Sequence, residues 1–541
     1  MKIAGQSDRT VIVVLSCAAL ILYTYNLGEL PLRDWDEGIV AGVARNIWRG
    51  MPDSDVWLYP TINYDQPYWN KPPLIHWLIA ITYSWFGVSQ WTTRLTPAIL
   101  SALSVPLLYK LARDILPTST GAIFSALVYL TLLPMVRHGR LAMLDGAIAT
   151  WFILTFWCLL RSYNRPRYFL GVGIGLGLTC LTKGMMMGVL LFAIALIFLL
   201  WDAPKLLRNF YLWLAIVLGV LPAIAWYLLQ YWHYGEQFLG VSLGEQTFNR
   251  IWQPISVSSP PWYYILELLK YTFPWLLFFP GGIAIALKTK DYTWAKLALI
   301  WSSIYFIAIS LMVTKLPWYI IPFYPIFSLL VGVNLAKIWQ DWSRGQRSRL
   351  QVKISFIFLS LFALAIGFIS IFYSYLNLSG DRFLQLILIA LAATFTLAAS
   401  TLWWKSRYFI VVLVLGLYSS YLLFFHSQLW VWELSEAFPV KPVAAIIRQH
   451  TPAKQIIYTS YDAVRPSLEF YSDRVILPAT DAELKKRWQE PNNVYFLLDS
   501  EALSRLNLNR PQILGDSVTW LLSSERNNPI RETWKLITKL K

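Results

Sequence analysis

The chain has 541 residues, of which 57% are apolar, 16% are aromatic and only 14% are charged. Soluble domains carry roughly 25% charged residues, so this composition excludes a soluble multidomain protein, a disordered chain and a fibrous protein, and leaves an integral membrane protein. Lys and Arg outnumber Asp and Glu by 46 to 30, which gives a net charge of +16. In a membrane protein the expected cause of this excess is basic cytoplasmic loops, and no nucleic-acid partner is expected.

Thirteen apolar runs predict transmembrane helices, because a helix needs roughly 20 residues to cross the hydrocarbon core of a bilayer. They are 11–27, 94–112, 119–136, 143–160, 168–182, 184–201, 211–232, 262–286, 294–313, 317–335, 354–375, 383–403 and 407–426. We therefore expect an α-helical polytopic membrane domain over residues 1–429. The run 72–87 is shorter and opens with two prolines; we expect a helix lying in the interface, with a short span as the alternative.

The loops between these runs differ in charge, and this difference orients the chain. One set of short loops holds nineteen basic residues, whereas the opposite loops are larger but hold fewer. The nineteen are Lys2, Arg9, Lys110, Arg113, Arg161, Arg165, Arg167, Lys205, Arg208, Lys288, Lys290, Lys296, Lys337, Arg344, Arg347, Arg349, Lys353, Lys405 and Arg407. Short basic loops stay in the cytoplasm, so we expect a multi-pass protein of the inner (plasma) membrane with a cytoplasmic N-terminus. With thirteen spans, the loop 28–93 and the C-terminal tail then lie outside.

The tail at 430–541 differs from the rest of the chain, because its charge density rises and its apolar runs shorten. The segments at 441–450 and 481–489 look helical, whereas those at 455–460, 473–477 and 493–499 look like strands bounded by turn residues. The tail is therefore predicted to be a small α/β domain on the extracytoplasmic side.

The run GVGIGLGLTC at 171–180 has a glycine spacing similar to that of a phosphate-binding loop. It lies inside a predicted span, however, and small residues in spans let two helices approach closely. We therefore expect these glycines to pack helices and not to bind phosphate.

Three acids cluster at the outer end of the first span, namely Asp34, Asp36 and Glu37. Apolar residues recur at helical spacing from Ile39 onward, so the acids stand at the start of a helix, where negative charge is favourable. Capping accounts well for one acid but poorly for three. The cluster is therefore a candidate functional site.

Several cations also lie at predicted outer ends of spans, namely Lys71, Arg140, Lys183 and Lys315. Lys71 precedes two prolines and fits a headgroup phosphate, although a snorkelling lysine with no specific partner is the alternative. Asp145 lies just inside an apolar run, and an acid there is by default a candidate functional residue. Pairing of Asp145 with Arg140 is its alternative explanation.

This arrangement has a chemical logic. A carboxylate can act as general base toward an acceptor hydroxyl, and cations can stabilise charge that develops on a lipid phosphate leaving group. The loop 233–261, with Glu245 and Arg250, adds further charge on the same side. The implied reaction is transfer of a group from a lipid phosphate to a hydroxyl at the outer face.

Six motifs in order resemble the membrane glycosyltransferases of GT-C fold, and most closely bacterial relatives of protein O-mannosyltransferases and of the lipid A aminoarabinose transferase. The motifs are Asp36-Glu37, Lys71-Pro72-Pro73, Arg140 to Asp145, Lys183-Gly184, SPPWYY at 259–264 with Pro274-Trp275, and Lys315-Leu316-Pro317. The resemblance covers most of residues 10–335; beyond that it extends only to the architecture.

The resemblance implies a polyprenyl-phosphate sugar as donor and a hydroxyl of a lipid, glycan or protein as acceptor. It implies Asp36 as catalytic base with Glu37 in support, Asp145 as a second acid, and inversion at the sugar. Lys71, and with it Arg140, Lys183 and Lys315, would bind the donor phosphate.

No metal ligands are assigned. Asn70 stands where the aminoarabinose transferases carry an acid, and Cys17, Cys158 and Cys180 all lie in apolar runs without metal spacing. No cofactor is therefore assigned, and a divalent metal stays open.

Two other functions are alternatives to a glycosyltransferase. A transporter or flippase of lipid-linked sugars typically has an internal repeat and ionisable residues near mid-membrane. Here the charges concentrate at outer span ends, with Glu267 and Lys270 as the main exception, expected to pair with each other. A structural factor of the envelope would leave the outer acids and lysines unexplained.

Overall fold

The computed structural model describes residues 6–62, 66–254, 259–345, 349–375, 382–404, 406–430, 440–461, 464–491, 493–522 and 529–539. The chain divides into two compact units. The helical unit contains Met1–Leu27, Trp69–Ile75 and Arg94–Trp430, and the mixed unit contains Gly28–Tyr68, His76–Thr93 and Val431–Lys541. The predicted basic residues Lys2, Arg347 and Lys405 lie outside the described residues, as does the predicted start of the tail at 431–439.

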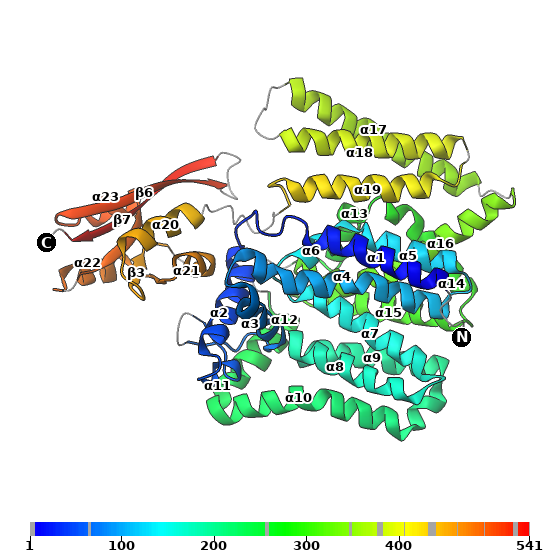
Figure 1. The fold of residues 1–541 in the computed structure, drawn as a ribbon, viewed down its shortest axis with the longest axis horizontal. Coiled ribbons are helices and arrows are strands. Elements are labelled where there is room, and N and C mark those ends of the chain that lie inside the picture. Colours follow the sequence, from blue (N-terminus) through cyan, green and yellow to red (C-terminus); the bar gives the residue numbers. More distant parts are fainter. Residues whose placement is uncertain are drawn as a thin grey trace. The chain divides into compact units, whose positions relative to one another are not determined.

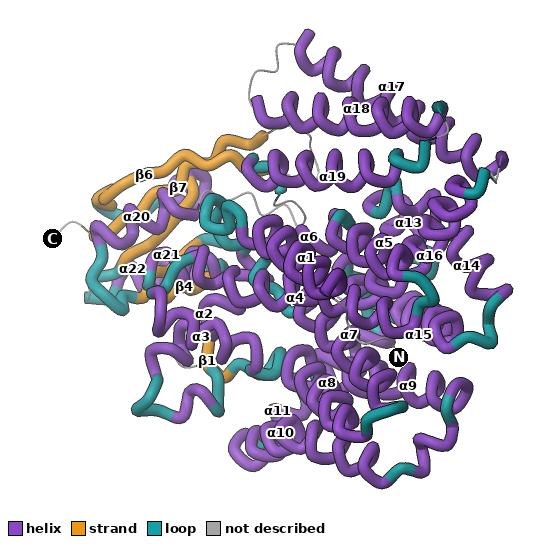
Figure 2. The backbone as a smooth tube through the Cα atoms, turned by 45° about the vertical axis from the view of Figure 1, so that its right-hand side comes forward, coloured by secondary structure: helices purple, strands orange, loops and turns teal. Residues whose placement is uncertain are grey.

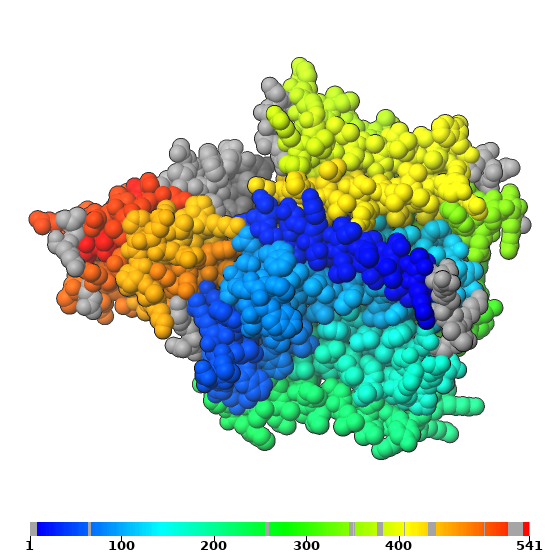
Figure 3. Space-filling model, in the orientation of Figure 1, coloured from blue at the N-terminus to red at the C-terminus, as the bar shows by residue number. Residues whose placement is uncertain are grey.

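Long apolar helices build the helical unit (Figure 1). Their bounds are α1 (Gln6–Thr24), α4 (Gln90–Ile115), α5 (Ser119–Leu130), α6 (Leu133–Arg140), α7 (Asp145–Ser162), α8 (Phe169–Lys183), α9 (Met185–Asp202), α10 (Phe210–Tyr234), α13 (Tyr263–Tyr271), α14 (Phe279–Lys288), α15 (Thr293–Leu311), α16 (Tyr324–Ser343), α17 (Arg349–Tyr375), α18 (Arg382–Trp403) and α19 (Phe409–His426). Shorter helices between α10 and α13 are α11 (Glu236–Leu239), η5 (Gly240–Phe248) and α12 (Asn249–Trp252). In Figure 3 the side chains of α17 and α18, in yellow-green, lie at the surface of this unit, as expected of helices that face lipid.

The span count differs from the prediction. Among the described residues, eight helices are long and apolar enough to cross a membrane, or up to ten if each of two bent helix pairs forms one span. Every predicted run overlaps helices, but some are short, such as α8 with 15 residues. The chain is a mostly helical integral membrane protein, and the count of thirteen is not confirmed.

Two predicted spans are broken, and proline explains where. The run 119–136 is divided between α5 and α6, which meet at 56°, and Pro134 stands in the first turn of α6. The run 262–286 bends by 111° between α13 and the helices from Trp275 to Lys288, and Pro274 stands at the break. Proline lacks the N–H that a continuing helix needs, so it is tolerated only near a helix start.

The glycine-rich run predicted to pack helices does so. A Cβ on Gly173 would lie 1.8 Å from the Ala215 carbonyl oxygen, and one on Gly177 would lie 1.8 Å from that of Gly219. The backbones of α8 and α10 therefore meet at these residues, and no larger side chain fits between them. This prediction is confirmed.

The mixed unit combines two stretches of chain far apart in sequence. From the first come η1 (Asp34–Gly38), α2 (Ile39–Gly50), η2 (Asp55–Trp57), the short strands β1 (Thr61–Ile62) and β2 (Gln66–Pro67), and α3 (Leu74–Phe86). Val43, Ile47, Tyr68 and Ala80 form a small core among them. The helix α3 falls in the run 72–87 and has 13 residues, too few for an ordinary span.

The tail forms a five-stranded sheet in the order β4-β3-β5-β7-β6 (Figure 2). The strands are β3 (Ile456–Thr459), β4 (Val475–Pro478), β5 (Tyr495–Asp499), β6 (Pro511–Leu522) and β7 (Pro529–Lys539), and the helices are α20 (Val440–His450), α21 (Pro466–Ser472), α22 (Asp481–Gln489) and α23 (Ser500–Leu506). Strand β3 pairs in parallel with β4 and β5, whereas β7 pairs antiparallel with β5 and β6. The predicted helices α20 and α22 and strands β3, β4 and β5 are confirmed; α21, α23, β6 and β7 were not predicted.

Replacing Gly177 by Val is expected to lower thermal stability, because the new side chain must separate α8 from α10. The matched control is Gly367→Val, since a Cβ on Gly367, also inside an apolar helix, meets no atom within 4 Å. Thermal unfolding in detergent measures both variants. Equal midpoints for the two would contradict the packing assigned to Gly177.

Candidate functional site

A cavity of about 580 Å³ lies in the helical unit between α9, α15 and the segments that carry Lys71, Arg250 and Tyr319. It is lined by Lys71, Lys183, Met186, Met187, Val189, Leu190, Ala193, Gln246, Thr247, Arg250, Ile251, Trp252, Tyr305, Ala308, Ile309, Leu311, Met312 and Tyr319. Its volume falls within the range of about 300–1,000 Å³ typical of ligand sites. The lining separates into a polar part, rich in cations, and an apolar part supplied mainly by α9 and α15.

Gln246 and Tyr319 connect the three cations of the polar part. The ammonium of Lys71 donates to Gln246 Oε1 over 3.3 Å, and Arg250 Nη2 donates to the same oxygen over 2.6 Å. Arg250 Nη1 donates to the Tyr319 hydroxyl over 2.9 Å, and Lys183 Nζ lies 4.9 Å from the centre of the Tyr319 ring. Two of the four predicted phosphate-binding cations, Lys71 and Lys183, are thus brought into one cavity.

Asp145 pairs with Lys183 through a short ion pair, and not with Arg140. The carboxylate stands in the first turn of α7, and the lysine is the last residue of α8. Gly184 follows with φ of +105°, a conformation that favours glycine, and α9 starts at the next residue. The alternative explanation, in which Asp145 pairs with Arg140, is therefore wrong.

Lys71 lies outside the membrane-spanning segments and is half-buried, and desolvation of its ammonium is the main cause that lowers its pKa, to about 7. The nearby charges of Arg250 and Lys183 lower the pKa further, while Asp145 raises it. Cations crowded together in a poorly hydrated place disfavour one another's charged form. An anion bound beside them would relieve that repulsion.

The other two predicted cations are not in the cavity lining. Arg140 donates to the carbonyl oxygens of Leu22 at 2.6 Å and Tyr25 at 2.5 Å, and its guanidinium stacks 4.1 Å above the Phe425 ring. Lys315 donates to the Met312 carbonyl through a short hydrogen bond, and burial lowers the pKa of its ammonium. For both residues, phosphate binding stays a prediction.

The three acids of the first outer loop lie on η1, in the mixed unit, and have different surroundings. Asp34 is buried and accepts hydrogen bonds from Arg465 Nη1 at 2.6 Å and from the backbone N–H of Ser467 at 3.1 Å. Glu37 is also buried and accepts from the backbone N–H of Arg33 at 3.0 Å. Asp36 forms an ion pair with Arg33 at 3.3 Å but keeps 24% of its side chain exposed. Of the three carboxylates, Asp36 is therefore the one that solvent can reach.

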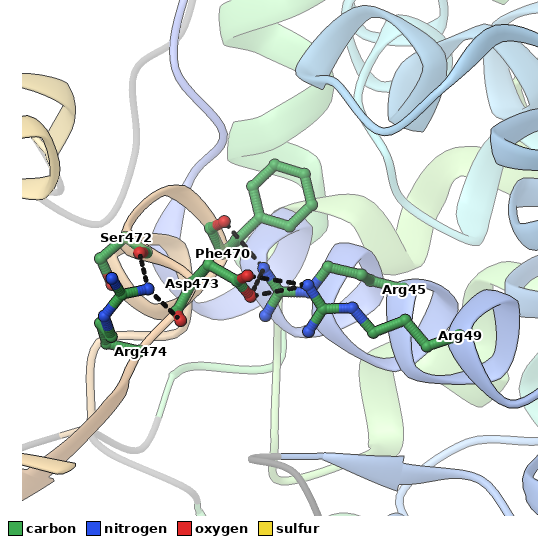
Figure 4. A network of polar contacts seen from close by, with 6 residues as sticks. All are labelled: Arg45, Arg49, Phe470, Ser472, Asp473 and Arg474. Carbon is green, nitrogen blue, oxygen red and sulfur yellow. Dashed lines mark hydrogen bonds and ion pairs between the residues drawn. The ribbon is translucent and has the colours of Figure 1, made fainter. Parts of the chain in front are cut away.

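The tail helix α21 holds the acidic segment at several points. Arg45 on α2 donates to the Phe470 carbonyl at 2.8 Å, and Arg45 and Arg49 both pair with Asp473 (Figure 4). A Cβ on Gly38 would lie only 2.7 Å from the Ser467 backbone nitrogen, so only glycine permits this approach. The acids thus stand on a segment fixed by residues more than 400 positions away.

Sequence reasoning missed three residues of the cavity: Arg250, Gln246 and Tyr319. Arg250 was noticed in its outer loop but received no role, because nothing local connects it with Lys71, nearly 180 residues earlier. Tyr319 follows the Lys315-Leu316-Pro317 motif, and a polar aromatic residue there was the one available signal.

Metal ligands are not grouped in the described part of the chain. No three His, Cys, Asp or Glu residues lie close enough together there to hold an ion. The sequence leaves open whether a divalent metal takes part, and that question is not tested by the structure.

Glu469 on α21 makes the mixed unit sensitive to pH. Burial raises the pKa of this carboxyl to about 7, against the opposing effects of the Ile476 N–H and of Arg45. Because the pKa is higher in the folded state, its contribution to stability is full below pH of about 4.5 and is lost as pH rises through about 7.

We expect hydrogen exchange of the α21 and β4 amides, corrected for the intrinsic rate, to speed up across this interval. In Glu469→Gln the acceleration should vanish, since the amide cannot ionise. The control is Glu490→Gln, an acid of the same tail whose side chain is 41% exposed. A pH dependence that survives in Glu469→Gln would refute the assignment.

Several known proteins are similar to this chain in sequence or in structure. Residues 70–228 match the family described as dolichyl-phosphate-mannose-protein mannosyltransferase. An uncharacterized protein of Aquifex aeolicus (strain VF5) is 27% identical over 471 residues, which cover 86% of this chain and 87% of that protein.

A named relative is the undecaprenyl phosphate-alpha-4-amino-4-deoxy-L-arabinose arabinosyl transferase of Shewanella sediminis (strain HAW-EB3). It is 26% identical, and the match covers 65% of this chain and 64% of the relative, just under two thirds of its length.

Among solved structures, ArnT from Cupriavidus metallidurans bound to undecaprenyl phosphate has the same fold, with a TM-score of 0.77, 18% identity and 97% of each chain covered. The predicted resemblance is therefore confirmed: the chain is similar in sequence to the aminoarabinose transferases and, over residues 70–228, to the protein O-mannosyltransferase family, and it has the fold of the Cupriavidus metallidurans structure.

Proposed function

We propose that this protein transfers a sugar from a polyprenyl-phosphate donor to a hydroxyl group at the outer face of the membrane. One observation carries the proposal: the cavity of the helical unit joins three cations to an apolar wall. Lys71, Lys183 and Arg250 suit a phosphate, and the side chains of α9 and α15 suit a hydrocarbon chain. A ligand that needs both is a lipid phosphate.

The relatives support the same class of donor. The Shewanella sediminis relative is named for undecaprenyl phosphate as carrier of its sugar, and the Cupriavidus metallidurans structure contains undecaprenyl phosphate. We therefore take undecaprenyl phosphate as the probe for this site. The sugar is a hexose or pentose, and the acceptor is a lipid, a glycan or a protein.

The proposed reaction is a single displacement at the anomeric carbon. The acceptor oxygen bonds to C1 as the bond from C1 to the phosphate oxygen breaks, and the configuration inverts. The acceptor proton passes to a carboxylate, and polyprenyl phosphate leaves with the bonding electron pair. The cations stabilise the charge that grows on the leaving phosphate.

Within this scheme Asp36 is the proposed base, because it is the reachable member of the acidic cluster. Glu37 supports it by binding the Arg33 backbone, and so by fixing the turn that carries Asp36. Asp145 acts as the second acid of the site by holding Lys183. Arg140 and Lys315 are proposed as further phosphate ligands, although their contacts in the structure give them weaker support than Lys71.

The proposed topology follows the basic loops. Thirteen spans place the N-terminus in the cytoplasm and the tail outside, and the boundary between a membrane domain and a small α/β domain falls near residues 429 and 430. The bent pairs support a count above eight, because a broken helix can still cross a membrane when neighbouring helices satisfy its backbone.

Replacing Lys71 by Gln is expected to weaken binding of undecaprenyl phosphate about tenfold to a hundredfold, because a charged hydrogen bond contributes about 1.5–3 kcal/mol. Binding is measured on the purified protein in nanodiscs. The control is Lys270→Gln, which removes an equal charge from a lysine whose side chain is 58% exposed. Equal losses in the two variants would contradict the cavity as phosphate site.

The pKa of Lys71 adds a second test. Its charge is lost as pH rises through about 7, so the affinity of the wild type should fall across that interval. Lys71→Arg should remove the fall, because a guanidinium stays charged. A parallel decline in both proteins would exclude Lys71 as its cause.

Asp36→Asn is expected to reduce sugar transfer about 10²- to 10⁴-fold, the usual contribution of a general base. Membranes containing each variant are supplied with a labelled undecaprenyl-phosphate sugar, and label in lipid, glycan and protein fractions is counted. Asp53→Asn, an exposed acid of the same loop, is the control. Undiminished transfer by Asp36→Asn would reject Asp36, and label that crosses vesicles without entering an acceptor would favour a flippase.

A further inference from the structure

A second cavity lies in the helical unit, beside the ends of α14 and α16 and the start of α17. Its volume is about 620 Å³, within the range of ligand sites. The helix α15 separates it from the first cavity: Leu311, at the end of α15, lines the first, whereas α14 ends at Lys288, shortly before α15 begins at Thr293. A 19-residue helix is about 28 Å long, so the two cavities lie at opposite ends of the bundle.

Two lysines and one acid give this cavity a net positive charge. Lys288, Lys337 and Asp341 line it, and among the described residues neither lysine ammonium has a hydrogen-bond or ion-pair partner. The Ser355 hydroxyl, also in the lining, is 1% exposed and has no hydrogen-bond partner. Such a group costs free energy unless a ligand or water satisfies it. The cavity therefore presents one buried hydroxyl without a hydrogen-bond partner, two exposed lysines and an excess of positive charge.

The remaining wall is apolar. Ile285, Ile338, Trp342, Leu402 and Phe409 surround the polar groups. A free phosphate in water would gain nothing from such a wall, whereas a membrane lipid brings a charged headgroup and the beginning of its acyl chains. Lys288 and Lys337 belong to the loops predicted to be cytoplasmic, and basic pockets between helices on that side are known to bind anionic headgroups.

We propose that this cavity binds the headgroup of an anionic glycerophospholipid from the leaflet at this end of the bundle. Lys288 and Lys337 would hold the phosphate, and Ser355 would donate to one of its oxygens or to an ester carbonyl. Two cations and one carboxylate leave one positive charge, which a lipid with one net negative charge neutralises. A zwitterionic lipid would leave the excess uncompensated. This inference does not depend on the proposed transferase activity.

Lipid binding to the purified full-length chain tests the proposal. The protein is stripped of lipid in detergent and titrated with phosphatidylglycerol or phosphatidylethanolamine, and bound lipids are counted by native mass spectrometry. The double variant Lys288→Gln/Lys337→Gln is compared with Arg165→Gln/Lys205→Gln. The second pair removes the same charge from exposed basic residues in other predicted inner loops that line neither cavity.

The expected result is tight binding of phosphatidylglycerol by the wild type and the control, and an affinity lower by about tenfold or more in Lys288→Gln/Lys337→Gln. Ser355→Leu, which removes the hydroxyl, places a larger apolar side chain in the lining and leaves the charges in place, should weaken binding as well. Equal losses in both double variants, or equal affinity of the wild type for phosphatidylethanolamine, would overturn the proposal. The proposal would also be overturned if both Ser355→Leu and Lys288→Gln/Lys337→Gln bound phosphatidylglycerol as tightly as the wild type.

Discussion

Uncompensated positive charge in a poorly hydrated cavity is the constraint from which the candidate site follows. Lys71, Lys183 and Arg250 share one end of the cavity, and Asp145 is the carboxylate paired with one of them. Water would normally screen such charges, but the side chains that line the cavity leave the three cations only partly exposed. The side-chain oxygens of Gln246 and Tyr319 accept hydrogen bonds from Lys71 and Arg250 and so stabilise part of this positive charge. The three cations thus lie together in a cavity that suits an anion. The packing of the rest of the helical unit must offset the free energy of their mutual repulsion.

The same constraint explains Arg140. Its guanidinium is buried, its Nη1 and Nη2 atoms donate to carbonyl oxygens at the end of α1, and it stacks on the faces of Phe425 and Trp430. The last carbonyls of a helix have no partner inside that helix. Arg140 replaces the water that would otherwise bind them. A cation at an outer span end can therefore serve the backbone, and position alone does not distinguish that role from phosphate binding.

This ambiguity marks the limit of what the sequence could predict. Apolar runs located the helices. The contact of Arg250 with Gln246 and Tyr319 depends on helix packing, which no local pattern encodes. The strand β6 was missed since a register shift between Ile513 and Gly515 interrupts the alternation that identifies strands. The contacts between α21 and η1 could not be predicted from sequence either, because these two helices lie near opposite ends of the chain.

The single residue between α8 and α9 sets the geometry of recognition. Lys183 ends one helix, Gly184 reverses the backbone, and the apolar wall begins directly with the next helix. Consecutive Cα atoms are about 3.8 Å apart, so charge and hydrocarbon surface are separated by a fixed, very short interval. A lipid phosphate attached directly to its hydrocarbon chain, as in the proposed donor, matches this short interval between the lysine and the apolar side chains of α9.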